Sequence, residues 1–242
     1  MELKKALAAL ACLLLTVGMF ASPFYAMSIT QLPDVQAYDT EGRDPFETHG
    51  ELSGFRDVTK PLLTFAEPKV VAHLWGRLNG LNFWGITLAL VLLHLRVRKL
   101  PELENRHGGL ESGGFWIALV GVVLTAFGNA LDYWIYFDQR NFLQGLSWPM
   151  TIQGLVIYAA GLVLVGVGLK KVAFVPRWVR ITFMFLSLAG YFPYLGYMAM
   201  LQSLSKAGLF LAVPFLGLFL LHVAAWWKLS LILWSPRRAT TA

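Results

Sequence analysis

The feature that most constrains the fold is a series of six apolar segments, at approximately residues 6–26, 70–95, 115–137, 149–169, 181–201 and 209–234. Each is long enough to cross a bilayer, which takes about 20 residues of helix. Lipid offers no partner for a free backbone N–H or C=O group, so such a segment spans it as a helix. The sequence therefore predicts an all-α, polytopic membrane protein. Residues 1–242 form a single transmembrane domain, a six-helix transmembrane bundle with an acidic extracytoplasmic loop.

Composition and charge agree with a chain that lies in a bilayer. Charged residues make up 14% of the chain, against about 25% in a typical soluble domain. The net charge of +6 comes from short basic clusters at the ends of the apolar segments. A nucleic-acid surface would need a basic stripe with interleaved aromatic residues, which the sequence lacks. The expected partners are the lipid bilayer and other membrane-protein subunits, and not nucleic acid.

The positions of the basic residues predict which side of the membrane each loop faces. With the N-terminus inside, twelve of the twenty Lys and Arg residues lie on the inner side and six on the outer side. This asymmetry satisfies the positive-inside rule. We therefore expect a plasma-membrane protein with both termini cytoplasmic. A cut after Ala26 would place Phe24 at the −3 position, where a small residue is needed, so the first segment is interpreted as an uncleaved anchor.

The loop between the first two segments, residues 27–69, is the longest polar stretch. It holds eight of the fourteen acidic residues and four basic ones. The acids are scattered and follow no EF-hand pattern, so we expect a solvated cap and no metal site. Residues 96–112 are interpreted as a solvated inner connection, and residues 137–148 as the polar turn between the third and fourth segments.

Glycines repeat every seven residues in two consecutive segments. They are Gly114, Gly121 and Gly128 in the third segment and Gly154, Gly161 and Gly168 in the fourth. The two sets are symmetric about position 141, so an antiparallel hairpin folded there would bring Gly121 level with Gly161. Small residues let helix backbones approach closely in lipid. We therefore expect the third and fourth helices to lie backbone against backbone.

Polar residues in the second and third segments indicate a shared cluster. Arg77 and Asp132 are equidistant from the centre of the loop that joins these segments, so a hairpin places them at one depth. His73 lies on the face of Arg77, and Asn129 lies on the face of Asp132. Two interpretations remain open: an ion pair and amide network that fixes helix register, or an outward-opening polar pocket. The pocket would bind an anion, a quinone head group or a proton.

Asn79 and Asn82 lie on the opposite face of the second segment from Arg77. Polar groups inside a membrane face other helices, because exposure to lipid is costly. Two polar faces therefore predict that this helix has neighbours on both sides and lies centrally in the bundle.

His222 lies near the middle of the last segment, on the face of Trp226. A bis-histidine haem needs two histidines at one depth on adjacent helices. His73, His94 and His222 differ in depth, so a hydrogen-bonded core histidine is favoured over a haem b ligand.

Tyr191 and Tyr194 flank Pro193 in the fifth segment. They form either an interfacial aromatic belt or the far wall of the polar pocket. Trp226 and Trp227 at the inner end of the last segment are interpreted as a second belt.

Enzyme signatures are absent from the sequence. It contains no Walker A or GxGxxG motif, no GxSxG elbow and no HExxH site. We favour a non-enzymatic accessory or structural helix bundle, with no catalytic residue and no cofactor expected. The alternatives are a small-solute or proton transporter or channel that uses Arg77 and Asp132, and a redox membrane subunit that binds haem or quinone.

Overall fold

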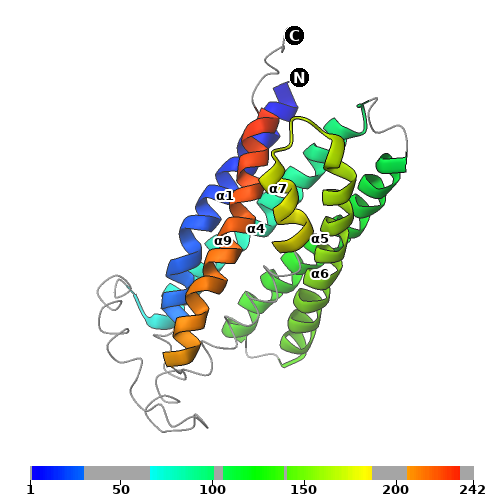
Figure 1. The fold of residues 1–242 in the computed structure, drawn as a ribbon. Coiled ribbons are helices and arrows are strands. Elements are labelled where there is room, and N and C mark those ends of the chain that lie inside the picture. Colours follow the sequence, from blue (N-terminus) through cyan, green and yellow to red (C-terminus); the bar gives the residue numbers. More distant parts are fainter. Residues whose placement is uncertain (1, 30–65, 101–105, 139–140, 187–205, 235–242) are drawn as a thin grey trace.

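A computed structural model describes residues 2–29, 66–100, 106–138, 141–186 and 206–234 (Figure 1). These residues are almost entirely helical and include no β-strand. The elements are α1 (Glu2–Ile29), α4 (Pro68–Val97), α5 (Arg106–Asp138), α6 (Asn141–Gly168), the 3₁₀ turn η2 (Leu169–Lys171), α7 (Arg177–Ile181), the π-helical turn η3 (Thr182–Leu186) and α9 (Lys206–Trp234).

Five of these helices, α1, α4, α5, α6 and α9, are long and apolar enough to cross a membrane. The prediction of an all-α membrane bundle is confirmed, and the chain is an integral membrane protein. Of the predicted span 181–201, the structure describes residues 181–186, which belong to α7 and η3. The rest of that span, and nearly all of the acidic loop 27–69, lie outside the described residues.

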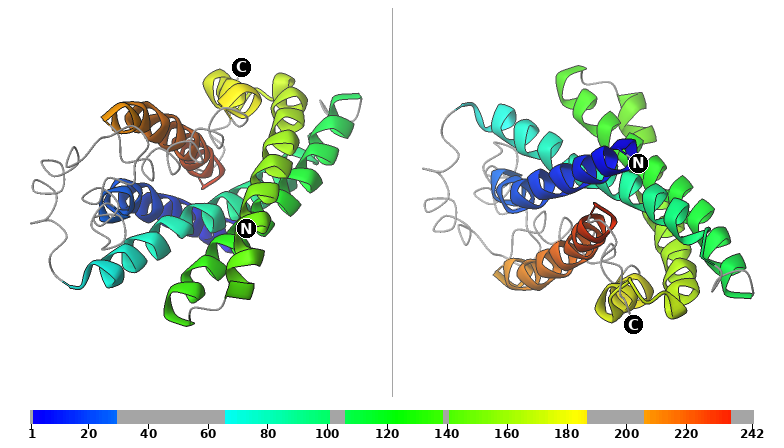
Figure 2. Two further views of the ribbon diagram at one scale, coloured as in Figure 1. Left: turned by 90° about the horizontal axis from the view of Figure 1, so that it is seen from below. Right: turned by 90° about the horizontal axis from the view of Figure 1, so that it is seen from above.

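Helix α4 lies between two groups of helices, as its two polar faces predict. It contacts α1 on one side and α5 on the other, while α5 and α6 form the most extensive contact between any two described helices. Seen along the bundle, α4 passes obliquely between α1 and the α5–α6 pair (Figure 2). The short elements α7 and η3 contact both α6 and α9.

Helices α1 and α9 run antiparallel, so the start of α1 and the end of α9 lie at the same end of the bundle (Figure 1). The indole N–H of Trp227 on α9 donates to Oγ1 of Thr16 on α1, at 3.0 Å. The end of α4 meets the end of α9, because Arg96 donates to the carbonyl oxygen of Ile232 at 2.9 Å. We call this the basic end of the bundle, after the cations that it carries.

The structure corrects the expected connection at 96–112. Helix α4 continues to Val97 and α5 begins at Arg106, so much of this stretch is helical. Glu111 is buried rather than solvated. Its carboxylate lies 3.1 Å from Nδ1 of His94, and its backbone lies against Gly168. Because the stretch is charged, nothing in the sequence indicated that the Glu111 side chain points into the bundle and contacts His94.

The polar stretch 137–148 is likewise mostly helical, because α6 begins at Asn141. The helix continues through Pro149, which lies inside it. The earlier start adds two turns to the apolar segment of the sequence. A proline is tolerated inside a transmembrane helix where neighbouring groups satisfy the freed carbonyl. Of the expected turn, the described residues, up to Asp138 and from Asn141 on, are helical.

Candidate functional site

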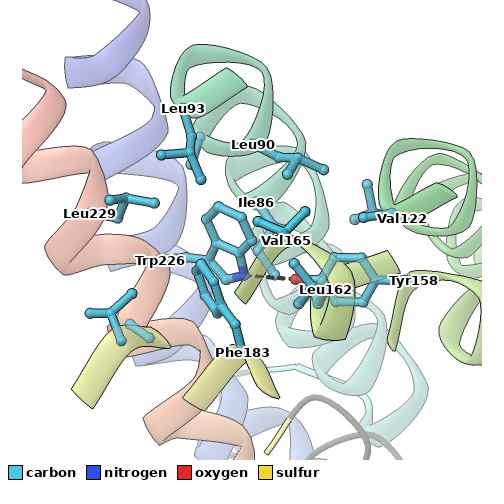
Figure 3. Packing of buried hydrophobic residues seen from close by; sticks show 14 of the residues in the cluster. Ile86, Leu90, Leu93, Val122, Tyr158, Leu162, Val165, Phe183, Trp226 and Leu229 are labelled. Carbon is cyan, nitrogen blue, oxygen red and sulfur yellow. Dashed lines mark hydrogen bonds between the residues drawn. The ribbon is translucent and has the colours of Figure 1, made fainter. Parts of the chain in front are cut away.

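Three side chains from α6 and α9 form a hydrogen-bonded cluster in the core. The indole N–H of Trp226 donates to the phenol oxygen of Tyr158 at 2.6 Å (Figure 3). That oxygen also lies 3.0 Å from Nε2 of His222. All three side chains are fully buried. Because an indole nitrogen only donates, the phenol oxygen accepts from Trp226 and its own proton is free to go to Nε2 of His222. We call these three residues the Tyr158 cluster.

Apolar side chains enclose the Tyr158 cluster. The ring centroid of Phe183, on η3, lies 4.5 Å from the ring centroid of Trp226 and 6.4 Å from that of His222. Leu162 and Val165 complete the wall on the α6 side (Figure 3). In such low-dielectric surroundings an unpaired polar group would be costly, so the hydrogen bonds fix how α6 and α9 meet.

The geometry of His222 bears on the haem interpretation. A haem iron bound through Nε2 would have to displace the Tyr158 hydroxyl, which lies 3.0 Å from that nitrogen. The residues present therefore do not fit an axial haem ligand at this nitrogen.

A second polar cluster joins α1 to α4. The hydroxyl of Ser22 donates to Oδ1 of Asn79 at 2.7 Å and also lies 2.8 Å from the carbonyl oxygen of Gly18. The amide nitrogen of Asn82 lies 3.3 Å from both the Ser22 and the Asn79 oxygens. All three side chains are buried. The sequence singled out Asn79 and Asn82, but their partner Ser22 lies 57 residues away from Asn79 and carries no signal of its own.

Close approach of the backbones brings this second cluster together. A Cβ atom built on Gly18 would lie 2.8 Å from the backbone nitrogen of Asn82, and one built on Gly85 would lie 2.7 Å from Cγ of Leu15. Any larger residue at Gly18 would push α1 away from the two asparagines. This contact depends on glycines that do not repeat at a regular interval, so the sequence pattern did not reveal it.

The third polar contact joins α4 to α5 at the basic end. Nδ1 of His94 lies 3.1 Å from Oε1 of Glu111, and the His94 ring stacks on Phe115 with centroids 3.9 Å apart and planes 6° apart. The Glu111 side chain is 4% exposed. A backbone contact with Gly168 adds α6 to this junction. Three helix ends therefore meet at one buried carboxylate.

The predicted pocket is described only in part. His73 and Arg77 lie on α4, the first half-buried and the second exposed, and Asn129 on α5 is half-buried. Asp132 belongs to α5, but its side chain lies outside the described part of the chain, so the Arg77–Asp132 ion pair stays a prediction. Tyr191 and Tyr194 also lie outside it.

The α4–α5 register is consistent with the predicted pair. His94 stacks on Phe115, and Trp84 meets Phe127 edge to face at 5.7 Å. These two contacts fix an antiparallel register that is symmetric close to the midpoint of Arg77 and Asp132. The register therefore brings those two positions to about the same depth.

The glycines of α5 and α6 face each other's backbones in a staggered arrangement. A Cβ atom on Gly121 would collide with the backbone of Tyr158, three residues from the level partner Gly161 that symmetry predicts. One built on Gly154 would lie 2.7 Å from the backbone nitrogen of Thr125. The remaining repeats behave alike: Gly114 faces Leu164, Val165 and the Gly161 carbonyl oxygen, Gly128 faces Thr151 and the Ser147 carbonyl oxygen, Gly161 faces Ala118 and the Gly114 carbonyl oxygen, and Gly168 faces Glu111.

This stagger corrects the expected level pairing. Two glycines set opposite each other would leave a gap, whereas a glycine opposite a larger residue gives that residue room and keeps van der Waals contact. Staggering by about half of the seven-residue repeat lets each helix fill the notches of the other. The shift agrees with the helix bounds, because α5 ends at Asp138 and α6 begins at Asn141, which puts the centre of the hairpin before position 141.

The Trp226 side chain is a further correction. The sequence pattern suggested an interfacial belt, but the indole is fully buried and bonded to Tyr158. Tyr158 itself was missed, although it lies between Gly154 and Gly161 and so shares their helix face. A tyrosine within a glycine repeat faces a neighbouring helix, where its hydroxyl needs a partner.

Comparisons with protein families, with curated proteins and with solved structures gave no match. The site is therefore interpreted from its own geometry.

Proposed function

We propose that the protein is a non-enzymatic accessory or structural helix bundle, which holds its place beside other membrane-protein subunits. One observation carries this proposal: each buried polar cluster of the described helices links different helices to one another. The Tyr158 cluster joins α6 to α9, Ser22 with the two asparagines joins α1 to α4, and His94 with Glu111 joins α4 to α5.

Polar residues inside a membrane are kept either to bind a substrate or to hold helices together. A substrate site leaves polar atoms directed at a cavity. In these three clusters the side chains are instead directed at one another across helix interfaces, at distances of 2.6 to 3.3 Å. Their geometry supports a scaffold with a fixed arrangement of helices.

Isolation of the intact chain from its own membrane in a mild detergent tests this function. The proposal expects a complex of defined stoichiometry with another membrane protein, read as a single mass by native mass spectrometry. It also expects no solute flux when the purified chain alone is placed in liposomes. A chain that is isolated alone and conducts a solute or protons in liposomes would contradict the proposal.

We also propose the plasma membrane as the location, with both termini on the cytoplasmic side. The charge asymmetry of the loops supports this orientation. Cysteine placed near the C-terminus of a Cys12→Ser chain should react with a membrane-impermeant thiol reagent only after the cells are opened. Reaction in intact cells would show that the C-terminus lies outside and would contradict the proposed orientation.

A second candidate function, transport of a small solute or of protons, is supported by the α4–α5 register, which brings the positions of Arg77 and Asp132 to one depth. A cysteine at Asn129 in the Cys12→Ser background should then react with a small water-soluble thiol reagent, and a solute in transit should protect it. If the cysteine at position 129 is not labelled in the folded chain, the transport proposal is contradicted, and the polar residues near Arg77 are interpreted as holding the helices together.

A further inference from the structure

The connection between α6 and α7 is fixed tightly to the bundle. The side chains of Val172, Val175 and Val179 are fully or almost fully buried. The guanidinium of Arg180 donates to the carbonyl oxygens of Leu169 and Lys170 in η2, the 3₁₀ turn that follows α6. The Leu169 carbonyl oxygen also accepts from the backbone N–H of Val172, so the arginine adds a side-chain bond to the backbone bond that closes this turn.

Arg96 fastens the same connection to two other helices. Its guanidinium lies 4.3 Å from the ring centroid of Phe174, and Nη1 donates to the carbonyl oxygen of Ile232 on α9. The ends of α4, α6 and α9 are thereby held together around one cation. Arg96 and Arg180 are both occupied in holding the chain.

Four other cations at this place are differently arranged. Arg98 and Lys99 follow the end of α4, and Lys170 and Arg177 lie on the connection; all four side chains are exposed. None of the four cations has an acidic partner among the described residues. Trp178, 41% exposed, lies next to Arg177.

We propose that these five residues, Arg98, Lys99, Lys170, Arg177 and Trp178, form a binding site for the head group of an anionic phospholipid. The site lies where transmembrane helices end, at the depth of lipid phosphates. Unpaired Lys and Arg side chains there attract anionic head groups, and an exposed tryptophan suits the same interfacial layer. The rigid connection holds the cations in place, which lowers the entropic cost of binding. This proposal goes beyond the scaffold function and holds whichever side of the membrane this end faces.

The test uses the full chain in a neutral detergent, with bound lipid counted by native mass spectrometry. Phosphatidylglycerol and phosphatidylcholine with the same acyl chains are titrated separately. The double variant Lys170→Gln/Arg177→Gln is compared with Lys4→Gln/Lys5→Gln, which removes the same charge at the same end but away from the connection. An unchanged thermal midpoint shows that each variant is folded. If the double variant does not fold, the single variant Lys170→Gln replaces it.

The proposal expects phosphatidylglycerol to bind in preference to phosphatidylcholine. It expects a loss of about tenfold or more in the affinity for phosphatidylglycerol when Lys170 and Arg177 are neutralised. The Lys4/Lys5 variant should bind as the unchanged chain does. Equal binding of the two lipids, or equal losses in the two double variants, would overturn the site.

Competition distinguishes the lipid from other anions. Inorganic phosphate at constant ionic strength should leave phosphatidylglycerol bound, because the head group is held close to the site by its anchored chains. Displacement by inorganic phosphate would assign the site to a free anion instead. Displacement by a poly-glutamate peptide would assign it to an acidic protein segment. Either displacement would contradict the proposal.

Discussion

The phenol oxygen of Tyr158 lies 3.0 Å from Nε2 of His222, and this contact joins α6 to α9. The residues are 64 positions apart in the sequence. The same oxygen accepts the indole N–H of Trp226 at 2.6 Å. One hydroxyl therefore satisfies two other buried polar groups, which makes it the most informative atom to remove.

Substitution Tyr158→Phe should destabilise the bundle by about 1–3 kcal/mol, the cost of leaving buried partners unbonded. The ring stays in place, so little of the change comes from lost packing. The measurement is the free energy of unfolding in mixed detergent micelles. The control is Ser230→Ala, because the Ser230 hydroxyl bonds only to the carbonyl oxygen of Trp226 in its own helix. If the Tyr158→Phe chain is as stable as the unchanged chain, the Tyr158 cluster does not stabilise the bundle.

Substitution Ser22→Ala should also destabilise the chain, by about 1–2 kcal/mol. It removes the oxygen that bridges Asn79 and Asn82 while changing side-chain volume little. Ser28→Ala is a matched control on the same helix, because the Ser28 hydroxyl bonds to the carbonyl oxygen of Tyr25 in the preceding turn. The same unfolding assay should give a clear loss for Ser22 and a smaller one for Ser28. The reverse order would contradict the proposed bridge between α1 and α4.

The helices could be predicted from the sequence because the bilayer imposes a length and a polarity on each segment. The central position of α4 followed from asparagines on the face opposite Arg77, which is a property of one helix alone. The partner of those asparagines, Ser22, could not be found in this way. A serine in an apolar segment forms an intrahelical bond as readily as a contact with another helix, and only the tertiary fold decides between them.

Register was the second limit. The glycine spacing indicated which faces of α5 and α6 meet, but symmetry about position 141 placed Gly121 opposite Gly161 rather than Tyr158. The glycines in the sequence show where a neighbouring helix can approach closely, but they do not show which residue of that helix lies opposite. Glu111 shows the same limit, because a carboxylate in a charged stretch is expected in solvent until the fold places a partly buried histidine beside it.

The predicted Arg77–Asp132 pair can be tested by exchanging its two charges. Asp132→Asn should cost about 1–3 kcal/mol of unfolding free energy, between the values typical of surface and buried pairs. The exchanged double variant Arg77→Asp/Asp132→Arg should recover most of the loss, because it restores opposite charges at the same two positions. If the exchange adds the two single losses instead, the residues are not paired.

The glycine interface of α5 and α6 gives the most direct comparison, because α5 carries a matched pair of glycines. A Cβ atom at Gly121 would lie 2.6 Å from Cα of Tyr158, while one at Gly113 would meet nothing within 4 Å. Gly121→Ala should therefore force the two backbones apart and lower the unfolding free energy by several kcal/mol, since backbone atoms cannot turn aside as a side chain can. Gly113→Ala should be neutral or stabilising by up to about 1 kcal/mol, because alanine favours helix.

Disulfide crosslinking between cysteines at Thr125 and Gln153 on the Cys12→Ser background reports the separation of the helices independently of stability. The Gly121→Ala chain should crosslink more slowly than the Gly113→Ala chain. Equal rates, with equal unfolding free energies, would mean that the backbones are not in contact at Gly121. The interface would then be held by side chains alone, and the seven-residue glycine repeat would have no part in how α5 and α6 meet.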